Sequence, residues 1–128
     1  MTQEEKDLLL KDIFGRIPYG VKCSYLDIEF NNTTHGNLES FEYDDDKDII
    51  FVIDGIGIYS EHVKPYLFPM SSMTKEQKKE YQYITERWMY DSSYSISDSI
   101  DWLNKNNFDY RGLIPLGLAI DCTNLNIY

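Results

Sequence analysis

The sequence of 128 residues is predicted to form a single α+β domain spanning residues 1–128. Three observations predict this class: a helical apolar repeat at the start, a middle region with β-branched runs and turn signals, and two capped helical patterns later. We expect an N-terminal helix, a small, curled, barrel-like antiparallel sheet of three to five strands, and two helices in the C-terminal half packed on that sheet. Apolar residues make up 42% of the chain, a composition typical of globular domains.

Residues 3–14 are predicted to form the first helix. Thr2 and Glu5 have the spacing of a capping box, in which side chains accept hydrogen bonds from free backbone N–H groups at a helix start. The apolar repeat that follows consists of Leu9, Leu10, Ile13 and Phe14. Pro18 cannot continue this helix, because proline disfavours the α conformation of the residue before it.

The middle of the chain is predicted to form the sheet. Residues 21–26 alternate imperfectly between two faces, as in a strand with one buried face. Residues 31–36 have the composition of a loop, and residues 38–43 alternate poorly. Residues 48–54, DIIFVID, contain a continuous apolar run with β-branched residues. The dipeptide Asp54-Gly55 then predicts a tight turn into another strand.

The second half begins with an extended segment and a helix. Two prolines four residues apart predict a crossover over residues 64–69, lying on the core and not paired in a ladder. Thr74 and Gln77 form a second capping box, which begins a helix of residues 75–90. One face of this helix carries Tyr81, Ile84 and Trp88.

Ser95 is predicted to begin a third helix. Its expected inward face consists of Ile96, Ile100, Trp102 and Leu103. Asn106-Asn107 can end this helix in a left-handed turn, because asparagine tolerates that conformation. Residues 117–121 are expected to add one short strand.

The charge distribution limits the partners that the protein can have. With 12 basic and 22 acidic residues, the net charge is −10. Residues 1–62 hold 14 acidic and 5 basic side chains, a net charge of −9, whereas residues 63–128 hold 8 and 7, a net charge of −1. Such a field repels phosphates, so direct nucleic-acid binding is not expected. Neither a secretory signal nor an apolar run of roughly 20 residues occurs, so we expect a cytoplasmic protein without a membrane partner.

The acidic segment YDDDKDI partly resembles a calcium-binding loop. Asp44, Asp46 and Asp48 alternate as the first ligands of such a loop would. The loop also requires a glycine at its sixth position and a glutamate at its twelfth. Ile49 and Gly55 stand there instead. We therefore interpret the segment as a solvated acidic turn between two strands and expect no metal site.

Motifs of the common catalytic and cofactor sites are missing from the sequence. It has no GxSxG elbow and no GxxxxGK[ST] phosphate loop, and Gly55-Ile56-Gly57 lacks the third glycine of a dinucleotide fingerprint. No CxxC or HxxxH pattern joins the two thiols, Cys23 and Cys122, to a histidine. We expect neither a cofactor nor a catalytic residue, and we interpret the thiols as small buried hydrophobes.

The segment FDYRGLIPLGLAID, residues 108–121, places charged side chains in an apolar run. Arg111 follows Asp109 closely, and a guanidinium can bind several carbonyls or one carboxylate in a fork. We predict structural roles for both residues, with Arg111 satisfying backbone carbonyls or an acid where the chain crosses the core. An anion-binding role for Arg111 is the alternative. Trp88 and Trp102 are also predicted to be structural.

Five segments of the chain carry a family resemblance. They are MTQEEKDLLLKDI, RIPYGVK, KPYLFPMSSMT, DYRGLIPLGLAID and the ending NIY. These segments resemble an abundant group of uncharacterised proteins from gut Bacteroides and their phages and mobile elements. The match covers both ends and residues 64–79, whereas residues 27–62 look like the variable part. The resemblance implies a shared scaffold and supplies no catalytic residue.

This division predicts where a partner binds. If the ends form a scaffold, the acidic middle region is where recognition would occur, because exposed loops on a rigid frame commonly bind partners. We therefore predict a non-enzymatic protein-interaction module of a phage or mobile element, with an unknown protein partner. Its expected binding residues are Asp44, Asp45, Asp46 and Asp48. Two alternatives stay open: a small-molecule-binding domain or enzyme with a pocket around Arg111, and an acidic DNA mimic that inhibits a host defence protein.

Overall fold

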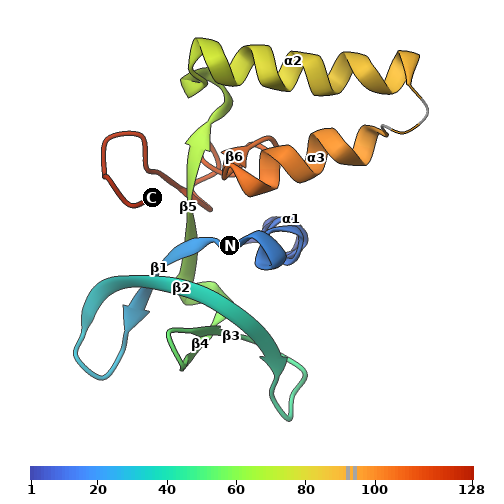
Figure 1. The fold of residues 1–128 in the computed structure, drawn as a ribbon. Coiled ribbons are helices and arrows are strands. Elements are labelled where there is room, and N and C mark those ends of the chain that lie inside the picture. The colour runs from blue at the N-terminus through green and yellow to red at the C-terminus, as the bar shows by residue number, and fades with distance from the viewer. Residues whose placement is uncertain (92, 94) are drawn as a thin grey trace.

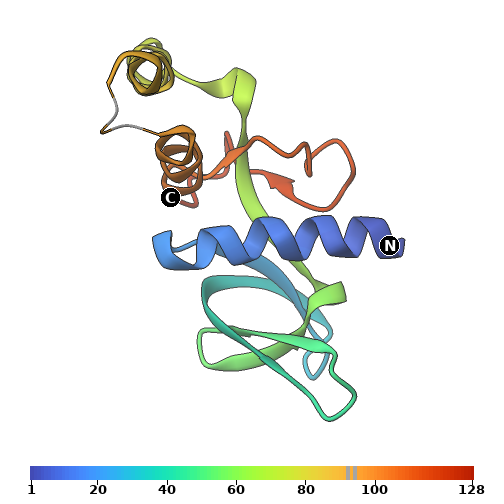
Figure 2. The same cartoon turned by 90° about the vertical axis from the view of Figure 1, so that its right-hand side faces the viewer.

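The computed structural model describes residues 1–91, 93 and 95–128, with only the backbone of Trp88. The helices are α1 (Gln3–Arg16), α2 (Lys75–Tyr90) and α3 (Ile96–Lys105), with 3₁₀ helices η1 (Ile17–Tyr19), η2 (Ser60–His62) and η3 (Met70–Ser72). The strands are β1 (Lys22–Asp27), β2 (Asn32–Tyr43), β3 (Ile49–Ile53), β4 (Ile56–Tyr59), β5 (Val63–Pro69), β6 (Phe108–Asp109) and β7 (Ile120–Asp121). The α+β class is thus confirmed. Figures 1 and 2 show the β3–β4 hairpin at one end, α2 and α3 at the other, and α1 between them.

The sheet is mixed and open, which corrects part of the predicted architecture. Its strand order is β4-β3-β2-β1-β5-β6, and β7 also pairs with β5. Strands β1 to β5 are antiparallel to their neighbours, as expected, but β6 and β7 run parallel to β5. These two short strands occupy the edge of β5 that would have to pair with β4 to close a barrel. The five antiparallel strands therefore curl without closing.

Strand β2 begins earlier than the sequence predicted. The segment 31–36, expected to be a loop, lies largely in β2, where Asn32 pairs with Asp27 and Asn37 with Lys22. Only residues 28–31 form the turn, because Asp27 Oδ1 accepts hydrogen bonds from the backbone N–H groups of two of them. Cross-strand pairing with β1 thus overrides the loop-like composition of this segment.

Strand β5, predicted to be an unpaired crossover, lies inside the sheet. It pairs with β1 on one side and with β6 and β7 on the other. Its prolines interrupt little of this pairing. In the pairing with β7, the paired residues of β5 are Tyr66 and Leu67, which follow Pro65, and Pro69 is the last residue of the strand.

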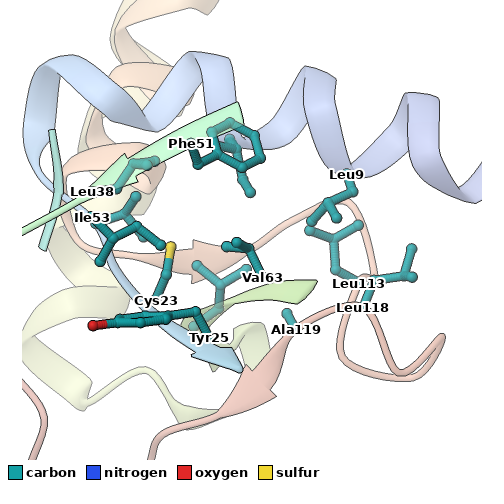
Figure 3. Packing of buried hydrophobic residues seen from close by; sticks show 13 residues of the cluster. Leu9, Cys23, Tyr25, Leu38, Phe51, Ile53, Val63, Leu113, Leu118 and Ala119 are labelled. Carbon is teal, nitrogen blue, oxygen red and sulfur yellow. The ribbon is translucent and has the colours of Figure 1, made fainter. Parts of the chain in front are cut away.

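The main hydrophobic core lies between α1, the inner face of the sheet and the C-terminal segment. Leu9 and Ile13 of α1 are fully buried in it, at 1% and 0% exposure. Figure 3 shows Leu9 lying against Leu113 and Leu118, which approach from the C-terminal segment. Burying each such side chain contributes about 2 kcal/mol to stability. This packing joins the first and last parts of the chain.

A second core cluster joins α2, α3 and β6. The rings of Tyr81 and Phe108 stack on Trp102, with centroids 5.4 and 5.6 Å away. The predicted inward face of α3 is only partly correct, because Ile96 and Ile100 are exposed. The helix instead buries Trp102 and Leu103, together with the polar Ser99 and Asn104. The predicted role of Trp88 concerns a side chain outside the described part of the structure.

Candidate functional site

The β3–β4 hairpin provides the frame of the candidate site. The predicted turn at Asp54-Gly55 is confirmed, since both residues have positive φ values, 49° and 80°. Such a pair forms the two-residue turn that matches the twist of a hairpin. Ile53 and Ile56 flank the turn and pair with each other.

The two faces of this hairpin differ in burial. Phe51 and Ile53 point to the core and are fully buried. Because side chains alternate along a strand, Ile50 and Val52 lie on the opposite, outer face, where they are only partly buried. We use the name β4 surface for Glu42, Ile50, Val52, Gly57 and Tyr59 on the outer face of β2, β3 and β4, together with Asp44 in the turn that follows β2.

Strand β4 has one unpaired edge. It lies at the end of the strand order, and the sheet pairs it only with β3 among the described residues. Since Ile53 and Ile56 close a two-residue hairpin, alternate residues of β4 direct their backbone groups away from β3. These groups are the N–H and C=O of Gly57 and the N–H of Tyr59.

Two carboxylates from β2 and its following turn reach across to β4. Glu42 Oε1 lies 4.0 Å from the position that a Cβ atom would have on Gly57, so this carboxylate sits over the backbone of the edge strand. Asp44 Oδ2 accepts a hydrogen bond of 3.1 Å from the Tyr59 hydroxyl. That hydrogen bond, with the nearby negative charge of Asp44, raises the pKa of Tyr59 above its usual value. The tyrosine therefore stays neutral and keeps donating.

The four aspartates predicted to bind a partner have different roles in the β2–β3 turn. Asp44 is half-buried, and its Oδ1 accepts hydrogen bonds from the N–H groups of Asp46 and Asp48 at 2.9 and 2.8 Å. Lys47 adopts a positive φ of 66° within this turn. The side chains of Asp45, Asp46 and Asp48 are exposed. Asp44 thus holds the turn together, and the other three present their charges to solvent.

Arg111 lies at the edge of a buried cluster of charged residues. Its Nε is 3.4 Å from Asp12 Oδ1, its guanidinium lies over the Tyr110 ring, and its side chain is 23% exposed. Asp12 also binds Arg16, which donates from Nη2 to the carbonyl of Phe108 at 2.6 Å. The acidic residue that Arg111 contacts is therefore Asp12 of α1.

Asp109, expected beside Arg111, makes a different set of contacts. Its two carboxylate oxygens accept hydrogen bonds from the backbone N–H groups of Leu113 and Ile114, at 2.8 and 2.9 Å. Asp109 is buried, so these contacts replace the water that it loses. They fix the bend of the segment that follows β6.

The thiols and histidines are not among the residues of the β4 surface. Burial, followed by the charge of Asp12, raises the pKa of Cys23 to about 12, so this thiol is not a nucleophile near neutral pH. His62 Nε2 lies 3.6 Å from Glu61 Oε1, between two surface hollows of about 470 and 360 Å³. Arg111 lines neither of these hollows. Across the described residues, His, Cys, Asp and Glu side chains form no group able to hold a metal ion.

Comparison with known proteins found no matching family model, no similar curated protein and no similar solved structure. Within the described chain, no helix combines the length and the apolar character needed to cross a bilayer. The candidate site is therefore defined by its own geometry.

Several residues of the site were missed from the sequence. Glu42, Ile50 and Gly57 come together only through the pairing of three strands. The poor alternation of residues 38–43 concealed the face of Glu42, because the register with β3 shifts between Leu38 and Ser40. For the buried pair Asp12 and Arg16 a signal did exist: they are four residues apart on the helix and adjoin its apolar stripe.

Proposed function

We propose that the protein is a non-enzymatic interaction module that binds a protein partner through its β4 surface. The observation that carries this proposal is the unpaired edge of β4 beside a partly exposed apolar face. Exposed strand edges are sites of association unless they are covered or blocked. Strand β4 carries no charged residue and no proline that would block such pairing.

The composition of the β4 surface supports binding of a protein over binding of a small molecule. It combines aliphatic side chains, Ile50 and Val52, with the aromatic Tyr59 and a border of carboxylates. Aromatic residues are enriched at protein interfaces, because they combine large contact area with a polar end. In this proposal the exposed aspartates of the adjoining turn, which the sequence predicted to bind a partner, form the polar rim. Their charge favours a basic partner.

Site-specific photo-crosslinking tests this proposal. The residue p-benzoylphenylalanine replaces Tyr59 in one variant and Tyr83 of α2 in a control. These tyrosines are matched, since they are 44% and 52% exposed. Each tagged variant is irradiated in a lysate of the native host cell, and adducts are separated by denaturing electrophoresis and identified by mass spectrometry.

The proposal predicts a discrete adduct for the Tyr59 variant that the Tyr83 variant does not form. Adding Asp45→Lys and Asp46→Lys to the Tyr59 variant should reduce that adduct, because both side chains are exposed near it. If the Tyr59 variant forms no adduct, or both variants form the same ones, the β4 surface is not the binding site.

A further inference from the structure

We infer that the partner contributes an extended segment with alternating basic residues, which adds to the free edge of β4 as a further strand. This inference rests on the proposed function and specifies the chemistry of the bound segment. Strand addition is a common mode of peptide recognition, in which backbone hydrogen bonds supply affinity and side-chain contacts supply specificity. The structure contains a backbone edge and a side-chain environment that suit this mode.

The free edge of β4 presents backbone donors and acceptors in extended geometry. The outward groups of Gly57, together with the outward N–H of Tyr59, form a short row of donors and acceptors on β4. Such backbone groups form hydrogen bonds either with a neighbouring strand or with water. The tight turn at Asp54-Gly55 and the pairing with β3 hold the row in extended geometry, so little conformational entropy is lost when a partner binds.

Gly57 indicates that a side chain of the added strand passes over β4. Gly57 does not have the positive φ that would favour glycine at this position. A Cβ atom here would instead lie 3.0 Å from Ile50 Cγ2 and 4.0 Å from Glu42 Oε1. The missing side chain leaves the Glu42 carboxylate accessible from the β4 edge. A lysine or arginine on the neighbouring strand can therefore reach across Gly57 to Glu42.

The other face of the edge favours an aliphatic residue at alternate positions. Ile56 and Ile58 point to the inner side of β4, opposite to Gly57 and Tyr59. Ile56 is 47% exposed, so this apolar side chain is available for contact. A segment with basic residues on the outer face and aliphatic residues on the inner face matches both environments.

The charge of the surroundings argues against a second copy of the same chain as occupant. Two β4 edges in contact would bring together two sets of carboxylates, those of Glu42, Asp44 and the exposed aspartates of the turn. Like charges at an interface are unfavourable, whereas a basic segment neutralises them.

The test uses the synthetic peptide acetyl-Gly-Lys-Val-Lys-Val-Lys-Gly-amide and the ¹⁵N-labelled full chain. Two-dimensional NMR spectra are recorded during titration, and amide hydrogen exchange is measured with and without the peptide. We expect saturable shifts in β4 and slower exchange at Gly57 and Tyr59. The matched peptide with glutamate in place of lysine should cause neither change. If the lysine peptide leaves both amides unchanged, the inference is wrong.

Two N-methylated peptides test whether the segment adds as a strand. Methylation of the lysine nitrogens removes donors from one edge of the extended peptide, and methylation of the valine nitrogens removes donors from the other. Strand addition predicts that only one of these peptides loses binding. Equal affinity of the two methylated peptides for the protein would contradict strand addition. Because only the peptide is altered, the fold of the protein is the same in both measurements.

Matched protein variants test the role of the Glu42 carboxylate. Glu42→Lys should weaken binding of the lysine peptide by about fivefold or more, as expected for loss of a favourable charge contact. Glu80→Lys on α2 changes the net charge equally at an exposed position away from the sheet and should have little effect. If both variants weakened peptide binding equally, the loss would be due to net charge alone, which would contradict the proposed contact with Glu42.

A negative result in the peptide experiment and a negative result in the crosslinking experiment refute different proposals. A Tyr59 adduct with a partner, together with no peptide binding at β4, would leave the proposed function intact and refute strand addition by a basic segment. Concentration-dependent protection of Gly57 in the protein alone would show that a second copy covers the edge, which would also refute the inference.

Discussion

Arg16 and Asp12 form an ion pair inside the core, with Arg16 Nε 2.7 Å from Asp12 Oδ2 and both side chains fully buried. The pair joins α1 to the C-terminal segment, because Arg16 also donates to the Phe108 carbonyl at 2.6 Å. The guanidinium further lies over the Tyr110 ring, 5.2 Å from its centroid. One arginine therefore connects the first helix to the chain 92 residues later.

Removal of both members of this pair should lower stability by less than the sum of the two separate removals. We expect Arg16→Met to lower the free energy of unfolding by about 3–5 kcal/mol, because it leaves the Asp12 carboxylate buried beside fewer donors. The double variant Asp12→Leu/Arg16→Met should lose less than the sum of the two single variants. Urea unfolding of all four proteins measures the coupling, and additive losses would contradict this account.

Arg111 should contribute less to stability than Arg16. It reaches the same carboxylate, but at 3.4 Å and from a partly exposed position. We expect Arg111→Met to lower the free energy of unfolding by about 1 kcal/mol and to lower the melting temperature. A variant with an unchanged melting temperature would refute the structural role and favour the anion-binding alternative.

The aspartates of the acidic turn should differ in their effect on stability. Asp44→Ala removes the acceptor of two backbone N–H groups and of the Tyr59 hydroxyl, so we expect a loss of about 1–2 kcal/mol. Asp45→Ala, an adjacent exposed position, should change stability by less than about 0.5 kcal/mol. Thermal unfolding of the two variants distinguishes turn formation from a general effect of negative charge.

The buried thiol of Cys23 should make the protein less stable at alkaline pH. Its pKa is about 12 in the folded protein, against 9.0 ordinarily, mainly because burial disfavours the thiolate. The unfolded state therefore releases this proton first, so stability present below pH 9 is lost as the pH rises towards 12. At pH 10 the loss from this group is about 1 kcal/mol.

The variant Cys23→Ala tests this assignment. The difference in its unfolding free energy between pH 7 and pH 10 should be smaller than in the parent protein by about 1 kcal/mol. Urea unfolding at the two pH values measures the difference. An identical pH dependence in both proteins would show that Cys23 does not carry the effect.

Local sequence signals predicted the helices well, because their caps depend on nearby residues. Thr74 and Gln77 form the predicted capping box, and α2 spans the predicted residues. The order of the sheet could not be obtained in this way. Strand β5 becomes internal only because β6 and β7, far along the chain, reach its second edge. Such long-range pairing leaves little signal in a short window of sequence.

The candidate site illustrates the same limit. The acidic turn was recognisable from its composition, but the hydrogen bond from Tyr59 to Asp44 was not, because these residues lie 15 positions apart and are brought together by strand pairing. The proximity of Glu42 to Gly57 requires the register of two strand pairs and the shift after Leu38. Sequence patterns indicated the region of the chain, and strand pairing determines which side chains meet there.

Hydrogen–deuterium exchange of the full chain, with and without the partner captured at Tyr59, tests the central claim most directly. If the β4 surface binds that partner, exchange should slow in peptides that cover residues 40–59 and stay unchanged in α2 and α3. Protection confined to α2 and α3, with residues 40–59 unaffected, would contradict the account.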